Sequence, residues 1–376
     1  MRLLYALLLL LLALPLTAQK GQVVTQAGAI KIETIADSLE HPWGIALLPD
    51  GRALVSERPG RLRILNLQDS TLSDPIEGVP EVYAEGQGGL LDVKLDPDFA
   101  DNQYVYLSYA DPGPDSTASS AFGRGRWTGE AIEDFEPLFV QEDKLKGEKH
   151  FGSRIVFDSS GHIFFAMGER FQFEPAQDLT NHLGTVVRLN RNGSVPDDNP
   201  FVGSDTARAE IYSYGNRNIQ AAAIDPATGQ LWVTEMGPMG GDELNAIQAG
   251  KNYGWPLVSW GDDYDGSDRP EPPTRPEFTD AAMHWTPTIS PSGMIFYTGA
   301  MFPEWQGSAL IGGLTASGLV RVVIQGTEQA EEVERIPLVV RVRDVVQAPD
   351  GSLYVLTDED NGKVLHLRKL AAPKSR

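Results

Sequence analysis

The chain has 376 residues, of which 31 are lysine or arginine and 52 are aspartate or glutamate, so that its net charge is −21. This acid excess argues against nucleic acid and anionic membranes as partners, because phosphate-rich surfaces bind proteins through basic patches. There is no cysteine, which excludes a disulfide framework and a lipid-anchored N-terminal cysteine. The core alone must therefore stabilise the fold, and a chain of this length can bury a large one.

The first 18 residues predict a secretory signal peptide. Arg2 precedes the apolar run LLYALLLLLLALPL, and the segment ends on the small residues Thr17 and Ala18. The run is short for a membrane span, and no second long apolar run follows it. We therefore expect cleavage before Gln19, a single domain over residues 19–376, and export to the periplasm or the cell exterior.

Short strand-like runs bounded by turn residues recur along the rest of the chain, while helical periodicity is scarce, so the sequence predicts an all-β fold. One phrase returns six times: an apolar strand, a turn rich in Asp, Pro, Ser and Gly, and a second apolar strand. A spacing of about 60 residues suits one four-stranded blade of a propeller. We predict a six-bladed β-propeller of four-stranded blades, with a large β-sandwich or jelly roll as the alternative. The copies begin at Trp43, Leu90, Ser153, Gln220, more loosely at Ser292, and at Val342.

Four polar residues stand just ahead of the first strand of a repeat or in the loop that leads to it: Gln87, His150, Arg217 and Arg341. Propellers carry functional groups on such loops, at one end of the central channel. The topology therefore predicts that one face of the ring collects all four.

Several common enzyme signatures are absent from the sequence. No G-x-G-x-x-G follows a predicted strand, and neither G-x-x-x-x-G-K-[ST] nor G-x-S-x-G occurs. The six histidines lack H-E-x-x-H spacing, and without cysteine a zinc site is disfavoured. A bound metal is expected to be a hard, oxygen-liganded ion such as calcium.

His150 stands in a polar loop with Lys149 before it and small residues after it, and Glu169 lies at the far end of the same predicted hairpin. A carboxylate so close would fix the imidazole tautomer and raise its basicity. The pattern favours His150 as a general base. A metal ligand and a hydrogen-bonded structural histidine are the alternatives.

Arginines and a glycine-rich loop suggest a charged ligand. Arg217 and Asn218 precede a strand, and Arg341 and Arg343 alternate so that both side chains point to one side. Converging guanidinium groups match a ligand with several carboxylates or phosphates, although ordinary surface ion pairs are an equal alternative. The loop over residues 235–256 can direct peptide carbonyls at a calcium ion, with Asp242 or Glu243 supplying charge.

Seven stretches together resemble the soluble pyrroloquinoline quinone-dependent sugar dehydrogenases, closest to the aldose sugar dehydrogenase branch. The resemblance implies a six-bladed propeller that binds pyrroloquinoline quinone (PQQ) and calcium at the channel mouth and oxidises the anomeric carbon of aldoses to lactones. It runs in order from His41 to Leu367. The stretches are HPWGIALLPDG, GQGGLLDVKLDPDF, KHFGSRIVFD, YSYGNRNIQ, EMGPMGGDELN, GKNYGWP and RVRDVVQAPDGSLYVLTD.

The resemblance also implies a role for each matching residue. His150 would take the proton from O1 of the sugar while hydride passes from C1 to the quinone, and Glu169 would orient this base. Gln87 would lie in the substrate site, and Arg217 would polarise the quinone oxygen. The other implied contacts are Asn218, Arg341 and Arg343 to the cofactor, the carbonyls of Gly237 and Pro238 to the calcium at the quinone, and Glu243 and Tyr253 to a second, structural calcium.

Two residues depart from the family pattern. Thr315 stands where a cofactor-contacting lysine is usual, and Lys149 stands beside the base where glucose-oxidising relatives often carry an acid. A cation there should depress the pKa of His150. Tyr264 and Trp285 are candidate platforms for a sugar ring, but packing is the favoured role for each.

Two other functions remain as alternatives: a calcium-dependent propeller lactonase, and a non-catalytic extracellular propeller that binds glycans or proteins. Export predicts that electrons pass to a periplasmic or membrane-associated carrier rather than to a soluble nicotinamide. The small-molecule partner is expected to be an aldose.

Overall fold

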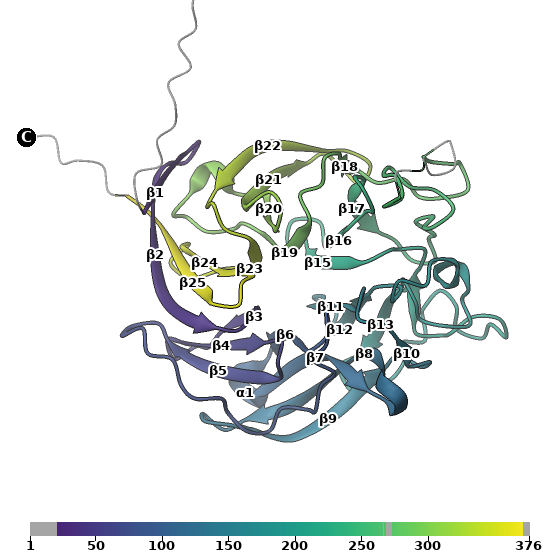
Figure 1. Ribbon diagram of the computed structural model, residues 1–376, viewed down its shortest axis with the longest axis horizontal. Coiled ribbons are helices and arrows are strands. Elements are labelled where there is room, and N and C mark those ends of the chain that lie inside the picture. The colour runs from purple at the N-terminus through teal and green to yellow at the C-terminus, as the bar shows by residue number, and fades with distance from the viewer. Residues whose placement is uncertain (1–20, 266, 268–272, 371–376) are drawn as a thin grey trace, which may run out of the picture.

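The computed structural model describes residues 21–265, 267 and 273–370, and the predicted signal peptide lies outside them. Within this part of the chain, 25 strands form six sheets that stand as blades around a central axis (Figure 1). The prediction of an all-β, six-bladed propeller is confirmed. No helix in the described residues is long and apolar enough to cross a membrane.

Each blade is a meander of antiparallel strands, and each begins with one of the six predicted repeats. The first blade holds β3 (Pro42–Leu47), β4 (Arg52–Glu57) and β5 (Arg61–Asn66). The second holds β6 (Leu90–Leu95), β7 (Tyr104–Pro112), β8 (Thr117–Trp127), β9 (Ile132–Val140) and β10 (Leu145–Lys146). The third holds β11 (Gly152–Phe157), β12 (His162–Met167), β13 (Val186–Asn190) and β14 (Ile211–Ser213).

The remaining blades follow the same plan. The fourth holds β15 (Ile219–Ile224), β16 (Leu231–Glu235), β17 (Asp242–Ile247) and β18 (Met283–Trp285). The fifth holds β19 (Pro291–Phe296), β20 (Ala309–Gly313), β21 (Gly318–Ile324) and β22 (Ala330–Pro337). The sixth holds β23 (Val342–Gln347), β24 (Leu353–Thr357), β25 (Gly362–Lys369), β2 (Gly28–Leu39) and β1 (Gln22–Thr25). The short helices are α1 (Phe99–Asn102) and the 3₁₀ turns Pro114–Ser116, Glu174–Gln177 and Pro303–Trp305.

The two ends of the chain close the ring together. Strand β2 pairs antiparallel with β25, from Ile30 opposite Lys369 to Leu39 opposite Gly362. The sixth blade thus takes outer strands from the N-terminus and inner strands from the C-terminus, which lie side by side in Figure 1. Ile30 is fully buried in the core that this blade shares with the fifth.

Every first strand is irregular near its start. The strands β3, β6, β11, β15, β19 and β23 each show a register shift against the second strand of their blade, and neighbouring first strands contact one another around the axis. Bulges bend a strand and redirect its side chains, so these six positions turn residues toward the axis. The shifts fall at Pro42/Ile45, Leu90/Val93, Gly152/Arg154, Ile219/Ala221, Pro291/Met294 and Val342/Asp344.

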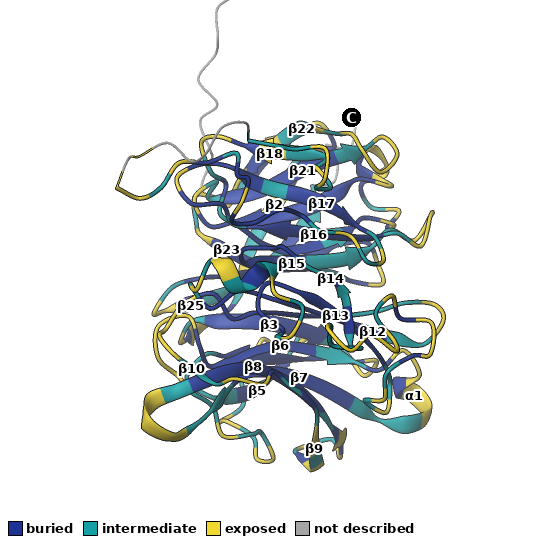
Figure 2. Cartoon of the chain, turned by 90° about the vertical axis from the view of Figure 1, so that its right-hand side faces the viewer, coloured by how far each residue is buried: buried dark blue, intermediate teal, exposed yellow. Residues whose placement is uncertain are grey.

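Burial follows the blade plan. Strands are buried along most of their length, and exposed residues gather in the loops at the edges (Figure 2). Separate apolar clusters fill the spaces between consecutive blades, with Trp232 and Trp305 among the largest side chains that are fully enclosed. This leaves the loops at the ends of the ring to carry function.

The closure of the ring makes a testable contribution to stability. Replacing Ile30 by Ala removes a fully buried side chain from β2, and we expect a loss of about 2–5 kcal/mol in the free energy of unfolding. Val24→Ala on neighbouring β1, where the side chain is 65% exposed, should cost less than about 0.5 kcal/mol. Urea unfolding measures both changes, and equal losses would contradict the closure.

Candidate functional site

A cavity of about 410 Å³ lies at the end of the ring where the first strands begin. All six loops that lead into these strands supply a lining residue. From the first blade to the sixth, these residues are His41, Gln87, Phe151, Asn218, Ser290 and Arg341. Of the four residues predicted to gather at one face, Gln87 and Arg341 line this cavity, and His150 and Arg217 do not.

His150 stands beside this cavity, immediately before the lining residue Phe151. Its Nδ1 lies 2.8 Å from Oε1 of Glu169, and its backbone N–H donates to Oε1 of Gln87 at 2.8 Å. The imidazole is only 4% exposed. A Cβ at residue 168 would stand 2.4 Å from the carbonyl oxygen of His150, so the glycine found there permits this close approach. The predicted pairing of His150 with Glu169 is present.

The surroundings keep His150 neutral at neutral pH. Burial lowers its pKa below the usual 6.5, the hydrogen bond to Glu169 acts in the opposite direction, and the cations Arg217 and Lys149 lower it further. Because the ionised carboxylate of Glu169 can only accept, the neutral ring donates from Nδ1 and keeps its lone pair on Nε2. The histidine is therefore poised to take up a proton.

Arg217 lies next to this pair. Its carbonyl oxygen accepts the backbone N–H of Glu169 at 2.9 Å, which joins the third and fourth blades. Its guanidinium is buried and donates to the carbonyls of Met236 and Gly237 at 2.8 and 2.9 Å, and to the hydroxyl of Tyr264 at 3.2 Å. The site thus combines a base and a fixed cation.

Arg341 and Arg343 share one carboxylate. Each donates to Oδ2 of Asp358 at 3.0 Å, and all three residues line the cavity. Burial alone would raise the pKa of Asp358, but the two arginines outweigh it and hold that pKa far below the usual range. Arg343 is nearly enclosed, whereas the Arg341 side chain is half exposed. The prediction that Arg341 and Arg343 point to one side is confirmed.

Several buried polar atoms around the cavity have no hydrogen-bond partner in the described residues. They include Nε of Arg58, Arg217 and Arg343, and Oδ1 of Asp358. The guanidinium groups give this end of the ring a local positive charge, which favours an anionic ligand. Asn218, predicted with them, lines the same cavity, where its Oδ1 accepts from Gln220 at 3.1 Å.

The lining residues that sequence reasoning missed include Arg58, Asp358, Trp43 and His41. Arg58 and Asp358 directly follow the second strand of their repeats, at the same end of the ring as the loops that lead in. Trp43 lies at the start of β3, and His41 precedes it. For Arg58 and Asp358 the signal was present, because a chain that enters a hairpin at one end also leaves it there. His41 and Trp43 lie on the entering side, where no charged pattern marked them.

The predicted calcium loop surrounds a second, smaller cavity of about 10 Å³, near the size of one water or ion. Gly237, Glu243 and Tyr253 line it together with Glu235 and Arg217. Burial, and then the charge of Glu235, raise the pKa of Glu243 well above its usual value. Two enclosed carboxylates that repel each other suit a divalent cation.

Two other residues predicted near a metal, Asp242 and Pro238, do not line the small cavity. Asp242 accepts the backbone N–H of Gly237 at 2.9 Å and that of Ser290 at 2.7 Å, so it holds the loop in place; burial raises its pKa to about 6. Pro238 is buried but lines neither cavity. No group of three or more His, Cys, Asp or Glu residues that could hold a metal occurs in the described ranges, so an ion here would rely on carbonyl oxygens.

Of the two candidate platforms for a sugar ring, Tyr264 is exposed and Trp285 is buried. Tyr264 is 61% exposed and bonds Arg217, whereas Trp285 is buried and its Nε1 donates to Glu332 at 2.8 Å. The packing role favoured for Trp285 is confirmed, because the ring is enclosed between blades, and it is not a platform for a sugar ring.

The two departures from the family pattern lie at the margin of the site. Thr315 donates to the carbonyl oxygen of Thr288 and bonds Ser290 Oγ, both at 3.0 Å, one residue beyond the lining Leu314. Lys149 is exposed, with its ammonium 4.6 Å from the ring centre of Phe171, and it is not among the lining residues. Lys149 therefore does not replace the missing lysine in the cavity wall.

Residues 39–366 match the family described as Glucose / Sorbosone dehydrogenase. The chain belongs to this family of oxidoreductases. It is 42% identical to the aldose sugar dehydrogenase YliI of Escherichia coli K12 over 359 residues, which cover 93% of this chain and 96% of that protein.

Solved structures agree with the family assignment. The apo-form of the soluble aldose sugar dehydrogenase from Escherichia coli superposes with a TM-score of 0.87 at 42% identity, covering 90% of this chain and 99% of that one. The PQQ-bound aldose sugar dehydrogenase from Streptomyces coelicolor superposes with a TM-score of 0.76 at 28% identity, covering 90% and 97%. The protein is thus a sugar dehydrogenase by family and by fold.

The charges around His150 predict opposite shifts in its pKa. Glu169→Gln should lower this pKa further, because the hydrogen-bonded carboxylate stabilises the imidazolium, and Lys149→Gln should raise it toward 6.5 by removing a nearby cation. Lys146→Gln, at the exposed end of β10, is the control and should change nothing. Histidine NMR titration measures all three, and a rise in Glu169→Gln would refute the assignment.

Proposed function

We propose that this protein uses PQQ and calcium to oxidise the anomeric carbon of aldose sugars to lactones, with His150 as the general base. The observation that carries the proposal is the mouth cavity, where unpaired guanidinium nitrogens surround a space beside a neutral, carboxylate-oriented histidine. The PQQ-bound relative supports the choice of quinone.

The lining residues fit the cofactor chemically. PQQ carries three carboxylates, and Arg58, Arg341 and Arg343 offer guanidinium groups on one side of a cavity large enough for a cofactor. Arg343 and Arg58 would hold the carboxylates with the donors that now lack partners. Asn218 would bind beside them. When bound, the quinone supplies the hydride acceptor for C1 of the sugar.

The chain's own groups perform the proton transfer and orient the reactants. His150 Nε2 would accept the proton from O1 as C1 loses hydride, while Glu169 stabilises the imidazolium that forms. Arg217 would donate to an oxygen that gains negative charge, since its guanidinium is fixed by two carbonyls. Gln87 keeps the His150 backbone in place and lines the cavity, so it would also contact the substrate.

Calcium would occupy two places in this proposal. The resemblance assigns the carbonyls of Gly237 and Pro238 to an ion at the quinone, which would add Lewis-acid polarisation. In the structure the Gly237 carbonyl oxygen accepts from Arg217 beside the small cavity, and Pro238 lines neither cavity. Glu243, with the Tyr253 backbone, would hold a structural ion in the small cavity, where burial and repulsion from Glu235 favour a cation. The leader-like N-terminus supports a periplasmic or secreted location, where an acceptor in that compartment would reoxidise the enzyme.

The base is tested by reconstitution. Purified apo-protein with PQQ and calcium should reduce an artificial dye when aldoses are supplied, and only when both are added. His150→Ala should lower kcat by about 100- to 10,000-fold, the usual contribution of a general base. His162→Ala, in the turn-proximal part of β12, is the control and should retain activity. Full activity in His150→Ala would sink the proposed mechanism.

The structural calcium is tested without turnover. Calcium should raise the melting temperature of the apo-protein by preferential binding to the folded state, and chelation should reverse the rise. Glu243→Gln should abolish most of this shift, whereas Asp265→Asn, in an exposed acidic loop, should preserve it. An equal calcium shift in both variants would place the ion elsewhere.

A further inference from the structure

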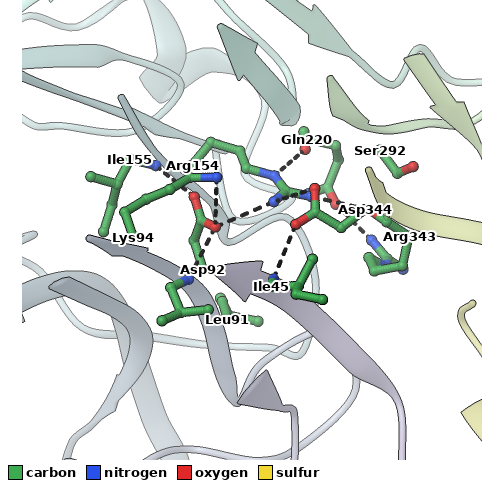
Figure 3. A network of polar contacts seen from close by, with 12 residues as sticks. Ile45, Leu91, Asp92, Lys94, Arg154, Ile155, Gln220, Ser292, Arg343 and Asp344 are labelled. Atoms are coloured by element: carbon green, nitrogen blue, oxygen red, sulfur yellow. Dashed lines mark hydrogen bonds and ion pairs between the residues drawn. The ribbon is translucent and has the colours of Figure 1, made fainter. Parts of the chain in front are cut away.

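Beneath the floor of the mouth cavity lies a buried arginine that sequence analysis did not single out. Arg154 sits at the bulge of β11, and its side chain is 2% exposed. Figure 3 shows its guanidinium between the carboxylates of Asp92 and Asp344. Unlike Arg58, Arg341 and Arg343, this arginine does not line the cavity.

The guanidinium contacts four other blades. Nε donates to the carbonyl oxygen of Gln220 on β15 at 2.8 Å, and Nη2 donates to that of Arg343 on β23 at 3.2 Å. Nη1 lies 3.2 Å from Asp344 and 3.4 Å from Asp92. The guanidinium carbon stands 4.0 Å from the ring centre of Trp43 on β3. One side chain thus links the third blade to the fourth, sixth, second and first.

The carboxylates around Arg154 are fixed in turn. Asp92 accepts the backbone N–H of Ile155 at 3.0 Å and lies 3.5 Å from the ammonium of Lys94. Asp344 accepts the backbone N–H of Ile45 at 3.3 Å. In the fifth blade, a Cβ on Gly293 would lie only 1.9 Å from Oδ1 of Asp344. This blade therefore contacts the carboxylate through the backbone of a glycine, where no side chain would fit. All six first strands therefore converge on this group of charges.

Three partners of Arg154 are themselves part of the cavity wall: Trp43, Gln220 and Arg343. Gln220 accepts from Arg343 Nη1 at 3.1 Å and donates to Asn218 at 3.1 Å. The backbone of two wall residues and the ring of a third are therefore held by one guanidinium. A shift of Arg154 would therefore be passed to Arg343 and, through Gln220, to Asn218, two of the groups that the proposed function assigns to the cofactor.

We propose that Arg154 is a positioning residue for the cofactor cavity: it holds Trp43, Gln220 and Arg343 in the arrangement that binds the quinone. The identity of the ligand rests on the proposed function, whereas the positioning of the wall does not. Arginine suits this place because its planar fork reaches two carbonyls and two carboxylates while its face stacks on an indole. Lysine keeps the charge but cannot make these contacts together.

The test compares Arg154→Lys with Arg321→Lys. Arg321 is also a buried arginine, with Nε donating to Glu334 at 3.1 Å and Nη1 to Ser308 at 3.1 Å, but it lies in β21 away from the cavity wall. Both variants should lose thermal stability. Titration of the folded apo-proteins with PQQ should show at least a tenfold weaker dissociation constant for Arg154→Lys and less than a twofold change for Arg321→Lys.

A second readout needs no cofactor. In Arg154→Lys, amide hydrogen exchange of the apo-protein should speed up in the three separate segments 42–47, 218–224 and 342–347, and in Arg321→Lys it should not. If the wild type does not bind PQQ, the proposed function is wrong. The amide hydrogen exchange of the apo-proteins then tests the positioning role of Arg154 by itself. If Arg154→Lys does not fold, Asp344→Asn takes its place with the same expected directions. If the wild type binds PQQ, an unchanged PQQ dissociation constant in Arg154→Lys overturns the proposal. If the wild type does not bind PQQ, unchanged amide hydrogen exchange in Arg154→Lys overturns it.

Discussion

The structure depends on the way six antiparallel blades begin at the same end of one ring. Because every first strand starts there, all six entering loops and several leaving loops meet around one cavity. The bulge at the start of each first strand then turns residues toward the axis. Charged groups from distant parts of the chain are thereby placed within hydrogen-bond distance, and the ring closure by β2 and β25 keeps them there.

The mouth cavity is lined by positive side chains although the whole chain carries a negative net charge. The chain carries a net charge of −21, yet arginines line the mouth cavity and only Asp358 offsets Arg341 and Arg343 there. In a partly enclosed site such cations act over short distances with little screening. The positive charge of the cavity lining is therefore opposite in sign to the net charge of the chain. Below the floor, Arg154 is neutralised by carboxylates and belongs to the scaffold.

Much of the fold and part of the site were predictable because they depend on local patterns. The six hairpins were visible as repeats, and the pairing of His150 with Glu169 followed from their places at the two ends of one hairpin. Arg58 and Asp358 were missed because attention stayed on the entering loops. Trp285 was considered for the mouth although its ring is enclosed between blades, which a single hairpin pattern does not reveal.

The sequence by itself determined the strands, the number of blades, the family and the residues of the entering loops, since alternation and turn chemistry act between near neighbours. Only the tertiary structure decided which charges meet. Arg154 and Asp344 are 190 positions apart, and their contact requires two bulges and the closed ring to bring β11 and β23 to one axis. Such a pairing depends on how all six blades pack, and no local segment of the chain contains that information.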